Sequence, residues 1–353
     1  MTVLKLGSLF DGIGVFPLAA MHCGMEPVWA SEIEARPISI TKRHFPDMLH
    51  LGDITKISGA EIPPVDVITF GSPCQDLSQI GTRNGFAGKK SSLFYQAMRI
   101  IEEMRYATNG RYPAFCIWEN VAGAFSSNDR LDFAAMLRAF TGAEVSVPSR
   151  GWAHAGMVRG GRADTAWRLL DAQYWGEPAL VQRRKRVFVV ADFAGQRAGE
   201  VLFKPRTVLP FSAAGGPGGL SATQRGGVPA AQTGRQVPVV RPFSLRRMRT
   251  MAQVGDQKGF CASFGRGGEP FPTLLASVTS PFSFWYEGEE SDGFLRVLTP
   301  LECERLMGLP ENWTKYGCKN EEISDHARYR ALGNSIALPC AEYVMAGIAE
   351  VMN

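Results

Sequence analysis

The sequence lacks paired cysteine motifs, clustered histidines and long hydrophobic runs. Its 7 cysteines are odd in number, no two of them form a Cys-x-x-Cys pair, and only 5 histidines are present. This pattern argues against a disulfide framework and a structural zinc site, so we expect no metal. No apolar run approaches the roughly 18–20 residues that span a bilayer, and the first residues do not resemble a secretory signal. We therefore expect a cytoplasmic protein without membrane association.

The composition is that of an ordinary globular protein. Hydrophobic residues make up 45% of the chain and charged residues 20%, which excludes disorder as the default. A length of 353 residues allows two domains, or one large domain with an insertion. The net charge of +4 indicates a polyanionic partner only weakly.

Two segments concentrate the basic residues. Residues 241–266 hold six basic residues against one acid, and residues 150–186 hold eight against three, so each segment carries a net charge of +5. Such clusters are expected on a face that contacts phosphates. A solvated surface explains them equally well from charge alone.

Short apolar runs alternate with helical patterns in the first half of the chain. Strand-like runs cover residues 3–9, 27–31, 48–52, 65–70, 114–118 and 186–191, and helical spacing covers 93–104 and 131–140. This alternation predicts an α/β fold in which a parallel sheet carries helices on both faces. Ligands of such sheets bind beyond the carboxyl ends of the strands.

The composition changes near residue 194. Residues 205–240 are rich in Gly, Pro, Ala and Ser, and regular patterning is weak until about residue 296. We therefore predict one domain from residues 1–193 and 296–353, and a smaller, loop-rich domain from residues 194–295. The sequence Thr-Pro-Leu-Glu at 299–302 is typical of a helix start, and residues 335–352 have the spacing of an amphipathic helix.

A glycine turn follows the first predicted strand. The sequence Phe10-Asp11-Gly12-Ile13-Gly14 permits a tight bend and the close approach of a ligand. Glu32 ends the next strand, and an acid at this distance commonly binds ribose hydroxyls. Because the third glycine of the dinucleotide fingerprint is absent, a nucleoside without phosphates, such as S-adenosylmethionine, fits better than NAD. A purely structural turn is the alternative.

Three further candidates lie at strand ends. Cys74 follows a Gly-Ser-Pro turn, where its thiol would face a bound substrate, although an inert buried cysteine is the common alternative. Glu119 ends another strand and would suit acid–base chemistry, or serve as a helix cap or surface acid. Arg184 and Arg186 share one face of a strand, where guanidinium groups bind phosphate or developing negative charge; a basic edge strand is the alternative.

Taken in this order, the motifs resemble those of the DNA (cytosine-5)-methyltransferase family. The resemblance rests on Phe-x-Gly-x-Gly at 10–14, Gly-Ser-Pro-Cys-Gln at 71–75, Glu-Asn-Val at 119–121, Gln-x-Arg-x-Arg at 182–186, the run Arg-Val-Leu-Thr-Pro-Leu-Glu from 296 and Gly-Asn-Ser at 333–335. It covers about residues 1–193 and 296–353. Residues 194–295 fit only by position, as the variable target-recognition domain of the family.

The resemblance implies a Rossmann-like methyltransferase sheet and a monomeric bacterial or phage enzyme. Such an enzyme transfers a methyl group from S-adenosylmethionine to carbon 5 of a cytosine flipped out of double-stranded DNA at a specific sequence. Cys74 would add to carbon 6, and Glu119 would bind or protonate nitrogen 3. Arg186 would hold the carbonyl oxygen of the ring, and Arg184 would support the site.

The resemblance also assigns cofactor and DNA contacts. The cofactor would contact Phe10, Asp11, Gly12, Gly14, Glu32, Ile33, Asp53, Ile54, Pro73, Leu93, Asn334 and Ser335. Residues 76–92 match the mobile catalytic loop of the family, in which Ser78, Arg83 and Lys89 would contact DNA. Arg246, Arg247, Arg249 and Arg266 are candidates for phosphate or guanine contacts.

One departure and three alternatives remain at this stage. The family usually has Gly-x-Pro-Gln before the arginine pair, whereas residues 176–182 read Gly-Glu-Pro-Ala-Leu-Val-Gln, a longer run, which leaves the placement of Arg184 open. The alternatives are a transfer RNA substrate, a DNA-binding protein without catalysis and a nicotinamide-dependent dehydrogenase. The basic 241–266 segment favours DNA, the intact nucleophile argues against a pure binder, and the missing glycine argues against the dehydrogenase.

Overall fold

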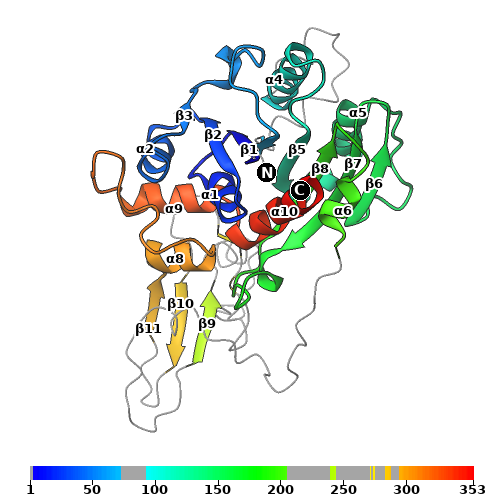
Figure 1. Cartoon of the computed structure of the whole chain (residues 1–353). Coiled ribbons are helices and arrows are strands. Elements are labelled where there is room, and N and C mark those ends of the chain that lie inside the picture. Colours follow the sequence, from blue (N-terminus) through cyan, green and yellow to red (C-terminus); the bar gives the residue numbers. More distant parts are fainter. Residues whose placement is uncertain are drawn as a thin grey trace.

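An eight-stranded sheet forms the centre of the computed structural model (Figure 1). The structure describes residues 3–72, 93–204, 239–243, 271, 273–274, 283–287 and 294–353. The predictions made for Pro73, Cys74, Ser78, Arg83, Lys89, Arg246, Arg247, Arg249 and Arg266 lie outside the described residues.

The strand order in this sheet is β3-β2-β1-β4-β5-β8-β7-β6. The strands are β1 (Lys5–Leu9), β2 (Glu26–Ser31), β3 (Leu49–His50), β4 (Val67–Phe70), β5 (Phe115–Val121), β6 (Ala155–Arg159), β7 (Asp164–Asp171) and β8 (Lys185–Asp192). Strands β1 to β5 pair in parallel. They confirm the predicted runs at 3–9, 27–31, 48–52, 65–70 and 114–118, although β3 is only two residues long.

The sheet is mixed, and the prediction of a parallel sheet was wrong for its last three strands. Strand β8 pairs antiparallel with β5, β7 pairs antiparallel with β8, and β6 pairs antiparallel with β7. The cause lies in the connections. Residues 160–163 join β6 to β7, and residues 172–184 join β7 to β8 through one 3₁₀ turn, η5 (Ala172–Tyr174). A parallel pair needs a crossover of a dozen or more residues, usually an α-helix, and these links contain no α-helix.

Helices cover both faces of the sheet, as predicted (Figure 1). On one face lie α1 (Val15–His22), α2 (Ala35–His44), α6 (Ala198–Leu202) and α10 (Leu338–Met352), and on the other lie α4 (Leu93–Ala107) and α5 (Leu131–Thr141). Each face has its own core, with Phe115 and Phe188 in the first and Phe94 and Trp118 in the second. Since complete burial of a large apolar side chain contributes about 1.5–3 kcal/mol, these two cores hold the layers together.

The helix start predicted at residue 299 is confirmed. Thr299 Oγ1 accepts a hydrogen bond from the Glu302 amide, and the Glu302 carboxylate accepts one from the Thr299 amide at 2.8 Å. This capping box satisfies two backbone donors at the start of α8 (Pro300–Leu306). Helix α9 (Asp325–Asn334) follows and leads into α10.

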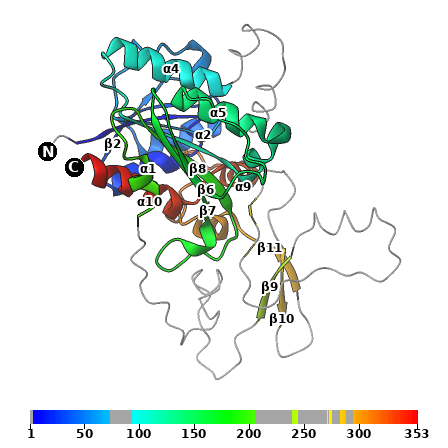
Figure 2. The same cartoon turned by 90° about the vertical axis from the view of Figure 1, so that its right-hand side faces the viewer.

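Three strands form a separate antiparallel sheet in the order β11-β10-β9. They are β9 (Val239–Phe243), β10 (Ser283–Glu287) and β11 (Phe294–Val297). Figures 1 and 2 show this sheet outside the eight-stranded one. Helix α6 lies just inside the range predicted for the smaller domain, yet its residues Ala198, Val201 and Leu202 are buried in the core of the large sheet. The domain boundary itself stays a prediction.

Within the described part of the chain, no helix taken alone combines the length and apolar character needed to cross a membrane. Helices α9 and α10 taken together meet the length and composition test across a bend of 43°. The inner face of α10, including Val344 and Ile348, is buried in the core.

Candidate active site

The strand order reverses between β1 and β4, since the chain builds the sheet outward from β1 in one direction and from β4 in the other. The carboxyl ends of β1, β2, β4 and β5 therefore meet at this switch point, where ligands of open α/β sheets bind. Two groups of predicted residues lie at these ends. One surrounds the turn after β1, and the other surrounds Glu119 at the end of β5.

The turn after β1 is held in left-handed backbone conformations. Phe10, Gly12 and Gly14 have φ angles of 53°, 59° and 77°. A Cβ atom placed on Gly14 would lie 2.8 Å from the Phe45 ring, whereas one placed on Gly12 would have no heavy atom within 4 Å. Gly14 is therefore required by packing and backbone, while the open space beside Gly12 leaves room for a ligand.

Glu32 ties the end of β2 to this turn. Its Oε2 accepts a hydrogen bond from the Gly12 amide at 2.9 Å, and its Oε1 accepts from the amides of Ile33 and Glu34 at 2.7 and 2.9 Å. These three amide donors fix the direction of the carboxylate. Ile33, beside it, is 72% exposed although it is apolar, so its side chain is available to a ligand.

Asp11 differs from Glu32 in having no such donors. Both of its carboxylate oxygens are buried, and neither has a hydrogen bond of normal geometry among the described residues. Burial raises the pKa of Asp11 to about 7; the nearby Ser8 hydroxyl opposes that rise, and the charge of Glu32 adds to it. The turn therefore contains a buried acid that lacks a counter-charge from the described residues.

Asp53 and Ile54 lie where the chain leaves β3. The Asp53 carboxylate accepts hydrogen bonds from the amide and hydroxyl of Thr55, at 3.0 and 2.9 Å, and these bonds lower its pKa. Ile54 begins η1 (Ile54–Lys56) and is buried. Ser31 at the end of β2 donates to the Gly52 carbonyl at 2.7 Å, which places this segment beside β2.

Glu119 meets Arg186 because β5 and β8 pair side by side. Register pairs Glu119 with Phe188 and Val121 with Arg186, and Arg186 Nε lies 3.0 Å from Glu119 Oε1 in a largely buried ion pair. Burial raises the pKa of Glu119, while the charges of Arg186 and Arg184 lower it in part. A Cβ atom on Gly71 would lie 3.1 Å from Glu119 Oε2, so the glycine leaves this carboxylate uncrowded.

Two side chains of β5 hold the residue that precedes the Pro-Cys pair. Trp118 Nε1 donates to the Ser72 hydroxyl at 3.1 Å, and Asn120 Nδ2 donates to the Ser72 carbonyl at 3.0 Å. The point from which the chain continues toward Cys74 is therefore fixed beside the strand that carries Glu119.

Arg184 is held in place despite the longer run before it. Its guanidinium is 1% exposed and donates to the carbonyls of Leu274 at 2.9 Å, Gly333 at 3.0 Å and Ser335. Its amide donates to the Asp171 carboxylate at 3.0 Å. The longer run lies between Gly176 and Gln182, and Gln182 is fully buried.

Helix α9 connects the two groups. Near its C-terminal end, the carbonyls of Gly333 and Ser335 accept from Arg184. On an earlier turn, Arg330 forms an ion pair with Glu34 at 2.6 Å, close to Glu32. Asn334 is exposed and Ser335 half-buried, and Leu93, the first residue of α4, is also half-buried.

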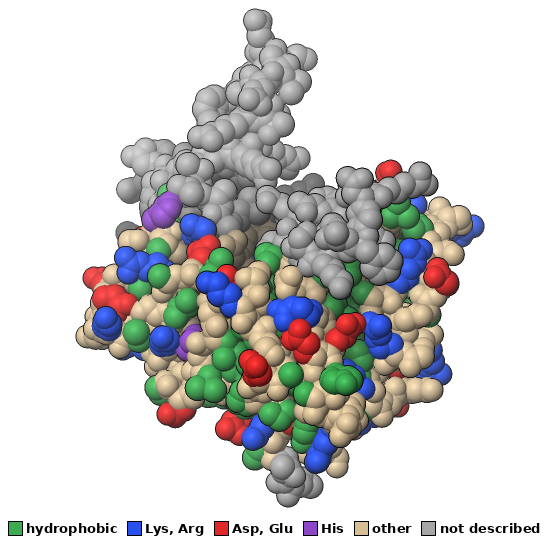
Figure 3. Space-filling view, turned by 90° about the horizontal axis from the view of Figure 1, so that it is seen from above, with side chains coloured by type: hydrophobic (Ala, Val, Ile, Leu, Met, Phe, Trp, Pro, Cys, Tyr) green, Lys and Arg blue, Asp and Glu red, His purple; other side chains and the backbone are tan. Residues whose placement is uncertain are grey.

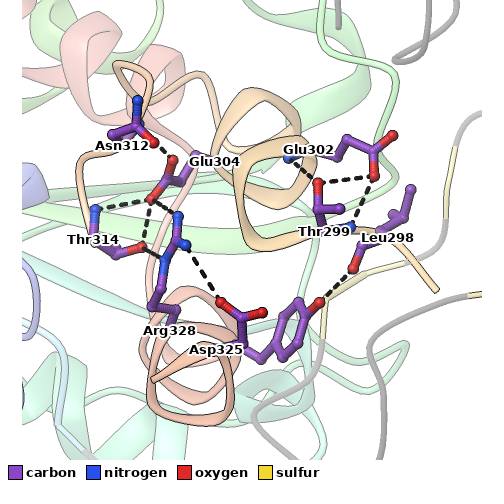
Figure 4. A network of polar contacts seen from close by, with 9 residues as sticks. Leu298, Thr299, Glu302, Glu304, Asn312, Thr314, Asp325 and Arg328 are labelled. Atoms are coloured by element: carbon purple, nitrogen blue, oxygen red, sulfur yellow. Dashed lines mark hydrogen bonds and ion pairs between the residues drawn. The ribbon is translucent and has the colours of Figure 1, made fainter. Parts of the chain in front are cut away.

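A buried polar network supports α9 from α8 (Figure 4). Glu304 is fully buried, and its carboxylate accepts from the amides of Asn312 and Thr314 at 2.8 Å each, and from Arg328 at 3.1 Å. Sequence analysis missed this network. In the sequence, Glu304 and Arg328 are two charged residues 24 positions apart. This separation gives no local signal that they pair.

Five of the eight basic residues in segment 150–186 form ion pairs or hydrogen bonds with other described residues. They pair as Arg159 with Asp164, Arg162 with Glu102, Arg168 with the Leu202 carbonyl, Arg184 with three carbonyls and Arg186 with Glu119. Figure 3 shows basic and acidic side chains interspersed over the described part of the surface in that view. The clustering in sequence therefore does not amount to a phosphate-contacting face for these five.

The described residues contain no group of three or more His, Cys, Asp or Glu that could hold a metal ion. The described cysteines are free; Cys116, Cys303 and Cys340 are buried, and burial raises the pKa of Cys340 to about 12. The three buried cysteines pack as small apolar side chains.

Comparison with known proteins identifies the class. The profile of the C-5 cytosine-specific DNA methylase family matches residues 4–204 and 245–350. The chain therefore belongs to this family, which confirms the resemblance seen in its motifs, and enzymes of the family use S-adenosylmethionine.

The individual relatives have low sequence identity to this chain but match nearly all of it. A DNA N-6-adenine-methyltransferase of Escherichia phage P1 is 24% identical over 98% of this chain and 61% of its own length, so the chain spans less than two thirds of that relative. The type II methyltransferase M2.BsuMI of Bacillus subtilis (strain 168) is 25% identical over 98% of this chain and 76% of its own length. A solved DNA modification methyltransferase encoded within a prophage (E. coli) has a TM-score of 0.60 at 17% identity, covering 99% of both chains, and shows the same fold.

The described residues fit the cofactor of the family. The space beside Gly12 admits a ligand, Glu32 is oriented for hydroxyl donors, and exposed Ile33 offers an apolar surface. The same turn carries Asp11, whose two carboxylate oxygens are buried. S-adenosylmethionine carries hydroxyl, apolar and cationic groups, which match these features.

Proposed function

We propose that the protein transfers a methyl group from S-adenosylmethionine to carbon 5 of a flipped-out cytosine in duplex DNA at a specific sequence, through a covalent adduct of Cys74. The observation that carries this proposal is the group of Glu119, Arg184 and Arg186 at the switch point, in which Arg184 is buried and the other two side chains are largely buried. These side chains lie beside the fixed residue Ser72, two positions before Cys74.

Chain connectivity supports the role of Cys74. Two extended residues span at most about 7 Å, so the Cys74 backbone cannot be farther than that from Ser72. Ser72 is bonded to Trp118 and Asn120, the two neighbours of Glu119 in sequence. A thiolate in this region can add to carbon 6 of a base whose other edge meets Glu119, which converts carbon 5 into an enamine-like nucleophile.

Glu119 and Arg186 would stabilise the charge that this addition creates. When the sulfur–carbon bond forms, an electron pair moves toward nitrogen 3 and the ring oxygen. A Glu119 with raised pKa can donate a proton to nitrogen 3, and the Arg186 guanidinium can hold the oxygen. The guanidinium of Arg184 donates to backbone carbonyls, so we assign it a supporting role beside the other two.

The cofactor supplies an electrophilic methyl group on a sulfonium. When bound, it would offer this methyl group to carbon 5 and would retain the electron pair of the broken carbon–sulfur bond on its sulfur. Loss of the proton at carbon 5 and expulsion of the Cys74 thiolate then restore the aromatic ring. We assign the cofactor contacts to Phe10, Asp11, Gly12, Gly14, Glu32, Ile33, Asp53, Ile54, Pro73, Leu93, Asn334 and Ser335.

DNA is the proposed partner of a monomer. Base flipping is required because the ring atoms are inaccessible in a stacked duplex. We assign backbone contacts to Ser78, Arg83 and Lys89, and phosphate or guanine contacts to Arg246, Arg247, Arg249 and Arg266. Base readout in the major groove by residues 194–295 would give the sequence specificity.

The test uses radiolabelled S-adenosylmethionine with pooled duplex DNA and, in parallel, transfer RNA. We expect label in duplex DNA with the wild-type protein and none with Cys74→Ser. Digestion to nucleosides should release 5-methylcytosine. Release of N6-methyladenine, the product named for the phage P1 relative, would overturn the assignment of the base. Label confined to transfer RNA would overturn the assignment of DNA.

A further inference from the structure

A short segment between the end of β5 and the start of α5 has an unusual backbone. Asn128, Asp129 and Arg130 have φ angles of 47°, 51° and 73°, in the left-handed region that residues with a side chain rarely adopt. The fully buried Asp132 holds this segment, since its carboxylate accepts from the Ser127 hydroxyl at 2.5 Å and from Asn128 Nδ2 at 3.0 Å. Backbone of this kind persists only where its surroundings enforce it, and it is common at binding sites.

A second segment, just before β6, is locked onto the first. Trp152 Nε1 donates to the Arg130 carbonyl at 3.0 Å, and the Trp152 ring packs edge-on against Phe133, with the ring centroids 5.0 Å apart. Gly151 has a φ angle of 83°, and a Cβ atom placed on it would lie 3.2 Å from the guanidinium carbon of Arg130. The Arg130 guanidinium therefore lies against the backbone of the residue that follows Arg150.

The sheet register places both segments on the edge that carries Glu119. Glu119 of β5 pairs with Phe188 of β8, which pairs with Arg168 of β7. Arg168 pairs in turn with Ala155, the first residue of β6, so residues 150–154 lead into β6 at this same edge. Neighbouring strands are about 4.8 Å apart, so three steps place β6 about 14 Å from β5.

Three exposed basic residues on this edge form no ion pair with another described residue. They are Arg130, Arg150 and Lys185, the first residue of β8, and we refer to them as the basic track. Alternation along β8 puts Lys185 on the face of Val187, which belongs to the core that α4 and α5 cover, and Arg130 directly precedes α5. The neighbouring acid, Asp129, is exposed and forms no ion pair with them.

The pairing of basic residues differs between the two edges of the sheet. Arg159 and Arg162 flank the turn from β6 to β7, which register places beside the amino end of β5. Both are paired with acids, Arg159 with Asp164 and Arg162 with Glu102. The basic track, in contrast, lies at the carboxyl end of β5. Positive charge is therefore left without a counter-charge at the edge where the proposed substrate binds.

We propose that the basic track binds phosphates of the duplex next to the flipped base and thereby fixes the DNA over the active site. This inference rests on the proposed function, because it takes duplex DNA as the substrate. Phosphates of one strand follow each other about every 3.4 Å along the duplex axis, so the distance of about 14 Å from β5 to β6 corresponds to about four nucleotides. Exposed guanidinium and ammonium groups bind phosphate oxygens, and such contacts set the position of the duplex without reading its sequence.

The experiment measures binding of the full chain to fluorescent duplex DNA by anisotropy, between about 50 and 200 mM salt. One duplex has a mixed sequence, and the other has only A·T pairs, which offers phosphates without cytosine. The variants are Arg130→Gln, Arg150→Gln and Lys185→Gln. The control is Arg111→Gln, which removes an exposed charge that lies over the Tyr112 ring, before the amino end of β5 and so on the opposite edge of the sheet.

We expect each variant of the basic track to weaken binding of both duplexes by about 3- to 10-fold at low salt. Each should also reduce the slope of log affinity against log salt by about 0.9, the value for one phosphate contact. Arg111→Gln should change neither quantity, and the affinity of all variants for S-adenosylmethionine should equal that of the wild type.

Unchanged slopes in Arg150→Gln and Lys185→Gln would overturn the inference, whatever happens in Arg130→Gln, whose backbone is strained. An equal change in Arg111→Gln would overturn it as well, because net charge rather than position would then explain the loss. In both cases a wild-type protein that methylates cytosine in duplex DNA would leave the proposed function standing. If the wild-type protein bound neither duplex and methylated no DNA, the proposed function itself would fail.

Discussion

The turn after β1 and the end of β5 both carry an acid at the switch point, but the charges around the two acids differ. Each holds a buried acid whose pKa is raised by burial, Asp11 after β1 and Glu119 at the end of β5. Glu119 is matched by Arg186 at 3.0 Å and lies near Arg184. Asp11 has only another acid, Glu32, for a charged neighbour among the described residues.

This difference indicates which kind of ligand each of the two regions binds. An acid with its own cations can exchange a proton with a neutral base while the arginines hold the charge that develops, so the β5 end suits a nucleobase. An acid without a cation suits a ligand that carries one, so the β1 end suits a cationic cofactor. Helix α9 contacts both regions: its Gly333 carbonyl accepts from Arg184, and its Arg330 pairs with Glu34.

The largest expected effect comes from removing the acid of the β5 end. Glu119→Gln should lower the rate of methyl transfer by about 10²–10⁴-fold, because it removes the proton donor while keeping the shape. Single-turnover rates at saturating cofactor measure this. The affinity for S-adenosylmethionine should not change; a variant that lost cofactor affinity and kept its rate would contradict the division between the two ends.

Breaking the support of α9 should be the next largest effect. Glu304→Gln removes the buried counter-charge of Arg328, which keeps only the exposed Asp325 at 3.4 Å, and should reduce the free energy of unfolding by about 3 kcal/mol. Urea denaturation measures it. The control is Glu311→Gln, which alters an exposed carboxylate paired with Arg305 and should change stability by less than about 1 kcal/mol. Equal losses in both variants would show that burial of the network adds nothing.

Asp11→Asn should stabilise the cofactor-free protein at high pH. Burial raises the pKa of Asp11 from an ordinary value near 4 to about 7, so the folded protein loses stability as the pH increases between those values, because the unfolded chain releases this proton while the folded state retains it. The gain at pH 8 should approach about 4 kcal/mol at most and shrink toward pH 5. Thermal melts of both proteins across this range measure it. Stability of the wild-type protein that rises with pH relative to the variant would contradict the buried, unpaired acid.

The smallest effect is expected from the exposed ion pair between Arg330 of α9 and Glu34. Arg330→Gln breaks the ion pair with Glu34, in which both side chains are about half exposed, and should lower stability by less than about 1 kcal/mol. High salt should remove the difference between variant and wild type. A loss that persisted in high salt would mean that this link matters more to α9 than the network around Glu304.

Much of the fold could be predicted because its signals are local. The apolar runs at 65–70 and 114–118 became β4 and β5, and Thr299 with Glu302 marked the start of α8. Strands β6 and β7 were missed. Strand β6 lies at the edge, with alternate residues exposed, and is joined to β7 by a short turn, so it lacks the continuous apolar run of a central strand.

The candidate site was predictable only where its residues end strands. Glu119 and Arg186 could be assigned to one site by motif, and the pairing of β5 with β8 brings them together. The carbonyls that accept from the Arg184 guanidinium lie 90 to 151 residues away in sequence. Because every residue type has a backbone carbonyl, the sequence does not indicate which ones bind Arg184. The same holds for the missing partner of Asp11, because a lack of contacts is a property of the folded chain.

The most direct test of the account traps the proposed adduct. Duplex DNA in which every cytosine is 5-fluorocytosine is incubated with the protein and S-adenosylmethionine. Fluorine at carbon 5 cannot leave as a proton, so the enzyme should remain attached to DNA under denaturing conditions. Peptide mapping should find the link at Cys74, and Cys74→Ala should form none. A wild-type protein that methylates ordinary DNA but forms no adduct, or an adduct mapped to another residue, would contradict the account.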